Sequence, residues 1–175
     1  MADRGNSWIQ TASGRPFWPM DPRPEEIFIE DIAHSLAMMC RYAGHCIHFY
    51  SVAEHCCHLH DAASEAARAH ALLHDASEAY IVDVPRPIKP HLVGYREIEA
   101  RIMSAVWKRF GLSETVPEEV HELDNRILMD ERAQNMSPSS QEWSLRVEPI
   151  GITLQYWTPP VAKREFLSRF VELSL

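Results

Sequence analysis

Long apolar runs are missing from this 175-residue sequence, and so is an excess of positive charge. A transmembrane helix needs about 20 consecutive apolar residues, so their absence excludes a membrane-spanning protein. The polar N-terminus also lacks the apolar core of a signal peptide, and we therefore expect a cytoplasmic protein with no membrane partner. The formal net charge of −8 argues against a nucleic-acid polymer as the main partner, because phosphate backbones bind basic surfaces.

Cysteine is scarce, and its four copies do not have the spacing of a zinc ribbon. We interpret all four as reduced thiols that pack as small apolar residues: Cys40, Cys46, Cys56 and Cys57. Internal repeats and low-complexity tracts are absent as well. The length and the 46% hydrophobic content are typical of one domain, residues 1–175, with its own core.

Apolar residues recur at helical spacing along most of the chain. They predict helices over residues 31–42, 51–63, 64–80, 95–110, 117–134 and 160–173. Ser51 and Glu54 form a capping box at the start of the second of these helices, and Gly44 stands where the first one ends.

Segments without helical spacing are few. Residues 1–26 contain four prolines and predict an extended arm with a short strand pair around residues 8–10 and 17–18. Three prolines in residues 83–90 predict an ordered loop, and alternating polarity predicts a short strand over residues 150–157. The fold class is therefore an all-α bundle with minor β decoration.

The most informative pattern is His74-Asp75, followed by Glu78. Neighbours on a helix point about 100° apart, yet both side chains can reach one cation from either flank of the helix. Upstream, His55 lies on the inward stripe of its helix while Glu54 points away. Downstream, Asp124 lies on the inner side of another predicted helix.

Two imidazoles and two carboxylates form a mixed donor set for one divalent ion such as Mn, Fe, Co, Ni or Zn. Four protein ligands leave coordination positions for water and for a phosphoryl oxygen. The alternative is that these side chains are hydrogen-bonded core residues. Because unpaired buried carboxylates are costly, four such residues on inner helix faces favour the metal site.

Cations that would bind a phosphate group are sparse in this acidic chain. Arg41 lies between apolar helix residues and a glycine turn, where its guanidinium can clamp phosphate oxygens. Arg86 could equally be an ordinary surface charge, and for Lys89 a surface position is the favoured interpretation. His45 and His48 either line the same phosphate-binding pocket as Arg41 or are ordinary loop residues.

The chain resembles the HD-domain metal-dependent phosphohydrolases, in the branch similar to bacterial 5′-deoxynucleotidases and phage deoxynucleotide phosphohydrolases. Five segments carry the resemblance: GRPFWPMDPRPEEI, IEDIAHSLAMMCRYAGH, FYSVAEH, ALLHDASEAYIVDVPRPIK and LDNRILMDE. The resemblance implies an HD-domain helical bundle and one divalent cation (Mn, Co, Ni, Fe, Zn or Mg). The family's ligand pattern falls on His55, His74, Asp75 and Asp124.

Further roles follow from the same resemblance. Glu78 matches the acidic residue that orients or deprotonates the attacking water, which makes it a catalytic residue together with Arg41. Arg41 and Tyr42 resemble an Arg-aromatic pair that holds phosphate and packs on the nucleotide, with Tyr in place of the deoxynucleotidases' Trp. Asp83 opens the proline-rich loop and could meet the sugar or a second cation, and Arg86 and Lys89 complete the expected substrate-binding set.

We therefore expect a metal-dependent hydrolase of phosphate esters that acts on a small (deoxy)nucleotide, like a 5′-nucleotidase. One alternative is a triphosphohydrolase that releases tripolyphosphate from a deoxynucleoside triphosphate. An alternative of another class is a non-catalytic nucleotide-binding or structural metal-binding protein. Trp8, Phe17 and Trp18 on the proline-rich arm are expected to pack against a second subunit of a homo-oligomer or, alternatively, to cap the nucleotide pocket.

Overall fold

Most of the predicted helices are present in the computed structural model, which describes residues 4–175 and is mainly α-helical. The α-helices are α1 (Ile29–Met38), α2 (Val52–Ala62), α3 (Arg68–Leu73), α4 (Glu78–Ile81), α5 (Tyr95–Arg109), α6 (Glu118–Asn135) and α7 (Pro159–Glu172). Short 3-10 helices are η1 (Pro24–Glu26), η2 (Arg41–Gly44) and η3 (Lys89–His91). Among the helices of this described part, none is long and apolar enough to cross a bilayer.

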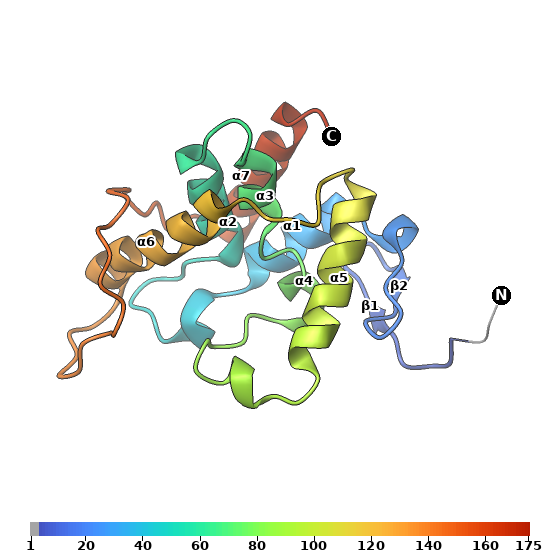
Figure 1. The fold of residues 1–175 in the computed structure, drawn as a ribbon, viewed down its shortest axis with the longest axis horizontal. Helices are drawn as coiled ribbons and strands as arrows, with labels where there is room; N and C mark the ends of the chain where they lie inside the picture. Colours follow the sequence, from blue (N-terminus) through green and yellow to red (C-terminus); the bar gives the residue numbers. More distant parts are fainter. Residues whose placement is uncertain (1–3) are drawn as a thin grey trace.

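The helices α1, α2 and α7 lie in the middle of the molecule, with α6 at one end and α5 near the other (Figure 1). Beyond α5 lies a two-stranded antiparallel sheet of β1 (Ile9–Gln10) and β2 (Pro16–Phe17), in which Ile9 pairs with Phe17. The predicted strand pair of the N-terminal arm is therefore confirmed. Residues 1–3 of the predicted arm lie outside the described residues.

Helix α2 contributes to two apolar clusters. The larger one joins it to most other helices and contains Ile32, Leu36, Val52, Leu72, Leu73, Ile102 and Phe166. The smaller one joins it to α6 and contains Leu59, Val120, Leu123 and Ile127. Burying one such side chain contributes about 1.5–3 kcal/mol, so the two clusters hold α2 firmly between its neighbours.

Phe17 belongs to this core rather than to an exposed arm. It is fully buried, and its ring stacks on Tyr80 of α4 with 3.9 Å between the ring centroids. The expectation that Phe17 packs against another subunit or caps a pocket is therefore wrong. Asp31 of α1 accepts hydrogen bonds from the backbone and hydroxyl of Ser13, and these bonds tie the hairpin to α1.

Two of the predicted helices differ from the observed ones, the first at its end and the third by a division in its middle. The first helix ends at Met38 and not at residue 42, because the chain turns extended and forms a bridge between Cys40 and Ser51. The backbone N–H of Arg41 then donates to the carbonyl of Tyr50 at 2.9 Å. A helix and this pairing compete for the same backbone groups, and the pairing is made here.

The predicted helix over residues 64–80 is divided into α3 and α4. At the division the Nδ1 atom of His74 lies 2.8 Å from the carbonyl oxygen of Ala71, the acceptor that a continued helix would offer to Asp75. Turn-type bonds follow, from the N–H of Ala76 to Leu73 and from the N–H of Glu78 to Asp75. His74 and Asp75 therefore lie on a turn and not on the side of a helix.

Residues 150–157 form no strand, contrary to the prediction, and carboxylates hold this extended segment instead. Asp130 accepts from the N–H groups of Ile150 and Gly151 at 2.8 and 3.0 Å. Fully buried Glu54 accepts from the N–H groups of residues 155, 156 and 157 at 2.7, 2.9 and 2.6 Å. The prediction that Glu54 points away from the interior is therefore wrong, because its side chain is fully buried under this segment.

Replacing Glu54 by Ala leaves three partly buried backbone donors without their acceptor, so we expect a loss of about 2–4 kcal/mol in the free energy of unfolding. Urea denaturation followed by circular dichroism measures this loss. As a control, Glu122→Ala on the exposed side of α6 should change stability by less than about 0.5 kcal/mol. Equal stability of the two variants would contradict the anchoring role of Glu54.

Asp61 predicts a pH dependence of stability. Its carboxylate pairs with Arg169 of α7 at 2.6 and 2.8 Å and with His60 at 2.9 Å, while Arg169 also contacts Glu165. Burial would raise the pKa of Asp61, but the hydrogen bonds from His60 and Arg169 outweigh it and the pKa is lowered. A lowered folded-state pKa gives stability that is present above the unfolded value, 3.8, and is lost as the pH falls further.

Because Asp61 is half exposed, we expect its contribution to stay below about 1 kcal/mol. The variant Asp61→Asn should therefore flatten the acid limb of the stability curve between about pH 5 and pH 2. Thermal melts across this range test it, and an unchanged acid limb would contradict the assignment.

Candidate metal centre

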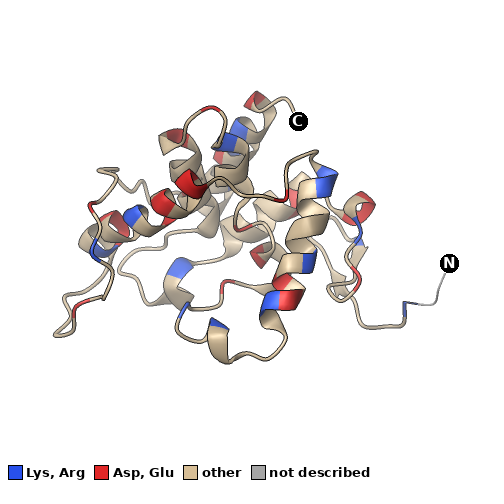
Figure 2. Cartoon of the chain, in the orientation of Figure 1, with Lys and Arg blue, Asp and Glu red and all other residues tan. Residues whose placement is uncertain are grey.

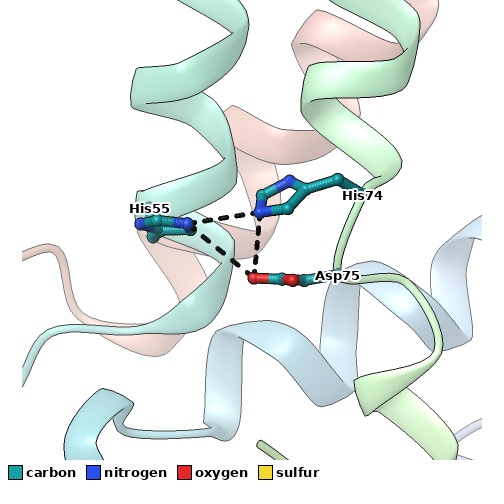
Figure 3. Close-up of side chains that lie close together, drawn as sticks. All are labelled: His55, His74 and Asp75. Carbon is teal, nitrogen blue, oxygen red and sulfur yellow. Dashed lines mark hydrogen bonds and ion pairs between the residues drawn. The ribbon is translucent and has the colours of Figure 1, made fainter. Parts of the chain in front are cut away.

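Three helical segments bring together the side chains of the predicted metal site. His55 projects from the middle of α2, His74 and Asp75 from the turn after α3, and Asp124 from α6. Figure 3 shows the two imidazole rings and the Asp75 carboxylate converging on one point. One ligand atom from each of these three residues lies within 4.8 Å of the other two, so the group could hold a metal ion.

The distances among the ligand atoms of His55, His74 and Asp75 fit coordination of one ion, and Asp124 lies beside this group. The Nε2 atoms of His55 and His74 are 3.3 Å apart, and the Oδ2 atom of Asp75 lies 3.8 and 3.1 Å from them. The Oδ1 atom of Asp124 lies 3.3 Å from the Nε2 of His55 and 4.0 Å from that of His74. Ligands bound at about 2.1 Å in adjacent positions lie about 3.0–3.4 Å apart, close to most of these values.

Hydrogen bonds at Nδ1 orient both rings. The Nδ1 of His55 lies 2.7 Å from the carboxylate of Glu131, and the Nδ1 of His74 lies 2.8 Å from the carbonyl of Ala71. Both partners are acceptors, so each Nδ1 carries a proton and donates it. In neutral rings both Nε2 atoms are then acceptors that face each other, an arrangement that requires a cation or a proton between them.

The charges around the site agree with this requirement. Burial would lower the pKa of His74, but the neighbouring Asp75 carboxylate outweighs burial and raises it well above its usual value. Burial would raise the pKa of Asp75 and of Asp124, yet His74 and His55 hold both carboxyl groups in the ionised form, with pKa values well below their usual range. A two-nitrogen, two-oxygen set with two negative charges suits a divalent cation, so the residues fit the predicted ion.

A cavity of about 670 Å³ opens on the carboxylate side of this cluster. Asp75 and Asp124 form part of its wall. The wall also contains every other residue predicted to act on a substrate: Arg41, Tyr42, Glu78, Asp83, Arg86 and Lys89. The segments that border it, η2 and the loop between α4 and α5, carry both signs of charge (Figure 2).

Glu78 lines the cavity in an unusual state. Its side chain is buried, and its Oε2 atom has no hydrogen-bond partner among the described residues. Burial raises the pKa of Glu78 well above its usual value, and the negative charges of Asp75 and Asp83 raise it further. Lys89 lies 3.7 Å from the other carboxylate oxygen and opposes this effect.

Arg41 is buried and lies on η2, not next to the end of an α-helix as predicted. Its Nη1 atom is 3.7 Å from Asp75, and its Nη2 atom is 3.2 Å from Glu131. The next two residues, Tyr42 and Ala43, have positive φ values of 57° and 51°, as does Gly44. This left-handed turn aims the guanidinium into the cavity.

The two other cavity cations are already paired. Arg86 donates to Asn125 at 2.8 Å and also to the carboxylate of Asp124. Lys89 lies 3.0 Å from Glu99 as well as near Glu78. His45 and His48 are exposed and do not belong to the cavity wall, so the loop interpretation fits them.

Sequence reasoning missed two residues of this site. Glu131 is fully buried and binds His55, Arg41 and Tyr42. The sequence does indicate its position, because Glu131 follows Asp124 by seven residues and a spacing of seven places two side chains on the same face of a helix. Trp143 lines the cavity from the loop after α6, where no periodicity marks it.

No family model matches the chain. The uncharacterized protein YfdR of Escherichia coli is 34% identical to it over 172 residues, which is 96% of both chains. The chain belongs to the YfdR family. An uncharacterized protein of Rhodobacter capsulatus is 32% identical over 121 residues, 63% of this chain and 62% of that protein. Neither relative's name states an activity.

The metal centre yields a test that needs no substrate. We expect His74→Ala and Asp75→Ala to lose stoichiometric binding of Mn or Co while keeping their helical circular dichroism, because each removes one member of the His55, His74 and Asp75 group. Calorimetric titration measures the binding. His91→Ala, an exposed residue of η3, is the control and should bind like the wild type. Full binding by the ligand variants would place the metal elsewhere.

Proposed function

We propose that this protein is an HD-domain, metal-dependent phosphohydrolase that removes phosphate from a small (deoxy)nucleotide. The observation that carries the proposal is a pair of facing imidazole Nε2 atoms, 3.3 Å apart, beside two carboxylates that open on a cavity. A volume of about 670 Å³ lies within the usual range for small-ligand sites and suits a nucleoside monophosphate. The resemblance of the sequence motifs to this superfamily supports the same choice.

When bound, a divalent cation would supply a Lewis acid for a phosphoryl oxygen and a water of lowered pKa. His55, His74, Asp75 and Asp124 would hold it. The mixed donor set suits Mn, Co, Ni, Fe or Zn better than Mg, which prefers oxygen ligands.

The remaining residues of the cavity have separable roles. Arg41 presents a buried guanidinium that offsets the charge developing on the phosphoryl group. Glu78, whose pKa is raised by burial and by the neighbouring carboxylates, can exchange a proton with the attacking water or the leaving oxygen. Tyr42 and Trp143, with 6.2 Å between their ring centroids, form an aromatic part of the cavity for the nucleoside.

The charges of the cavity favour a monophosphate over a triphosphate. Its wall has three cations, Arg41, Arg86 and Lys89, against four carboxylates. Arg86 and Lys89 are already paired with acidic side chains, so they are less available for the β- and γ-phosphates of a triphosphate. A structural metal site is disfavoured as well, because such sites are closed by protein ligands and this one borders a cavity.

Localisation in the cytoplasm and assembly into a homo-oligomer stay predictions of the sequence. They are compatible with an enzyme of nucleotide metabolism. Size-exclusion chromatography with light scattering tests the assembly directly.

The activity test is a panel of nucleoside mono- and triphosphates with Mn, Co, Ni, Mg and Zn supplied separately. We expect orthophosphate from deoxynucleoside monophosphates, identified by phosphorus NMR. Tripolyphosphate as product would favour the triphosphohydrolase instead. A protein that binds metal, releases no phosphate and unfolds on chelation would be a structural metal protein.

Glu78→Gln should retain metal and fold but lose about 10²–10⁴-fold in kcat, because a proton-transfer group is removed. Steady-state kinetics and metal titration on the same sample give both quantities. The exposed Glu97→Gln on α5 is the matched control and should keep the wild-type rate. Loss of the metal in Glu78→Gln would make Glu78 a ligand and contradict its catalytic role.

A further inference from the structure

Glu131 connects two parts of the site that are far apart in the sequence. Its side chain is fully buried on α6. The Oε1 atom accepts from the Nδ1 of His55 at 2.7 Å, and the Oε2 atom accepts from Arg41 at 3.2 and 3.3 Å and from the hydroxyl of Tyr42. Each carboxylate oxygen therefore serves a different partner.

We propose that Glu131 is a positioning residue that orients the metal ligand His55 and the phosphate-binding Arg41 at the same time. The orientation of His55, the metal half of the proposal, depends only on the candidate metal centre. The orientation of Arg41, the phosphate half, rests on the proposed function.

The metal half follows from the chemistry of imidazole. A ring can bind a cation through Nε2 only if Nδ1 carries the proton, and the Glu131 carboxylate accepts that proton's hydrogen bond. The Oε1 atom of Glu131 lies 2.7 Å from Nδ1, and both groups are fully buried. Because a carboxylate oxygen accepts, this contact fixes the His55 tautomer whose proton is on Nδ1.

The phosphate half follows from the position of Arg41. Two of its nitrogens bind Glu131, whereas Nη1 faces Asp75 at 3.7 Å. Arginine has many rotamers, and a buried carboxylate behind the guanidinium removes this freedom before a substrate arrives. Tyr42 is held by the same oxygen, so the aromatic side chain and the guanidinium share one anchor.

An amide in place of the Glu131 carboxylate cannot serve both partners. If the amide oxygen faced His55, the NH₂ group would face Arg41 and Tyr42, which are donors. If the NH₂ group faced His55, that ring would have to accept at Nδ1 and would carry its proton on Nε2, where it blocks the metal. The variant Glu131→Gln conserves shape and tests the carboxylate alone.

We expect Glu131→Gln to raise the Kd for Co(II) about 10–100-fold and to shift the visible absorption bands of the bound ion. At saturating Co(II), the Kd for inorganic phosphate should rise about tenfold or more, because Arg41 loses its charged partner. Calorimetry gives both constants. Tyr42→Phe, which removes one donor and leaves the carboxylate in place, should keep the wild-type Kd for Co(II).

Asp130→Asn is the matched control for stability. Asp130 is the neighbouring buried acid of α6, and it holds the backbone of residues 150 and 151 outside the metal site. This variant should lower the melting temperature and leave both Kd values unchanged. If Glu131→Gln lowers the melting temperature and leaves both constants at the wild-type values, Glu131 is structural and the proposal is wrong.

Glu131→Asp provides the same test should the glutamine variant fail to fold. It keeps the charge but is one methylene shorter, so it cannot reach both partners, and at least one constant should rise about tenfold. Two unchanged constants would overturn the proposal. If the wild type binds Co(II) but hydrolyses no phosphate ester, the proposed function fails, while the Kd for Co(II) still decides the metal half.

Discussion

The imidazole ring of His74 donates a hydrogen bond from Nδ1 to the carbonyl of Ala71, 2.8 Å away, where a continuous helix would bond its own backbone. The bond coincides with the division between α3 and α4 and leaves Nε2 free to face His55. The same turn points Asp75 toward His55 and places Glu78 at the start of α4. Competition for the carbonyl of Ala71 therefore coincides with the end of α3 and orients His74 toward the other two residues that could hold a metal ion.

Buried carboxylates hold the rest of the frame. Asp31 accepts the backbone N–H of Ser13 in the hairpin loop, and Glu54 and Asp130 accept backbone N–H groups from a segment that has no strand pairing of its own. Hydrogen bonds to a charged acceptor are stronger than neutral ones, and they make up for the missing secondary structure between α6 and α7. Glu131 uses the same principle on side chains, since its three donors belong to the metal centre and to the cavity wall.

The cavity combines groups that would repel each other in isolation. Asp75, Glu78, Asp83 and Asp124 share its wall, and Arg41, Arg86 and Lys89 lie among them. The pKa values separate accordingly: those of Asp75 and Asp124, beside the imidazole rings of His74 and His55, are lowered, whereas burial and negative neighbours raise those of Glu78 and Asp83. Carboxyl groups whose pKa values shift in opposite directions within one cavity are typical of functional sites.

The sequence by itself determined the elements whose signals are local. The spacing of apolar residues was sufficient to predict α5, α6 and α7. Ser51, whose hydroxyl accepts the N–H of Glu54, marked the start of α2. The same spacing placed His55 and Asp124 on inward faces, because side-chain direction on a helix follows from residue number alone.

Only the tertiary structure decided which partner each polar group takes. A turn between α3 and α4, the backbone under Glu54, the burial of Phe17 and the three donors around Glu131 all depend on segments distant in the sequence. Periodicity records which way a side chain points, but not what lies opposite it, and burial forces each polar atom to find a partner from whatever the fold brings near.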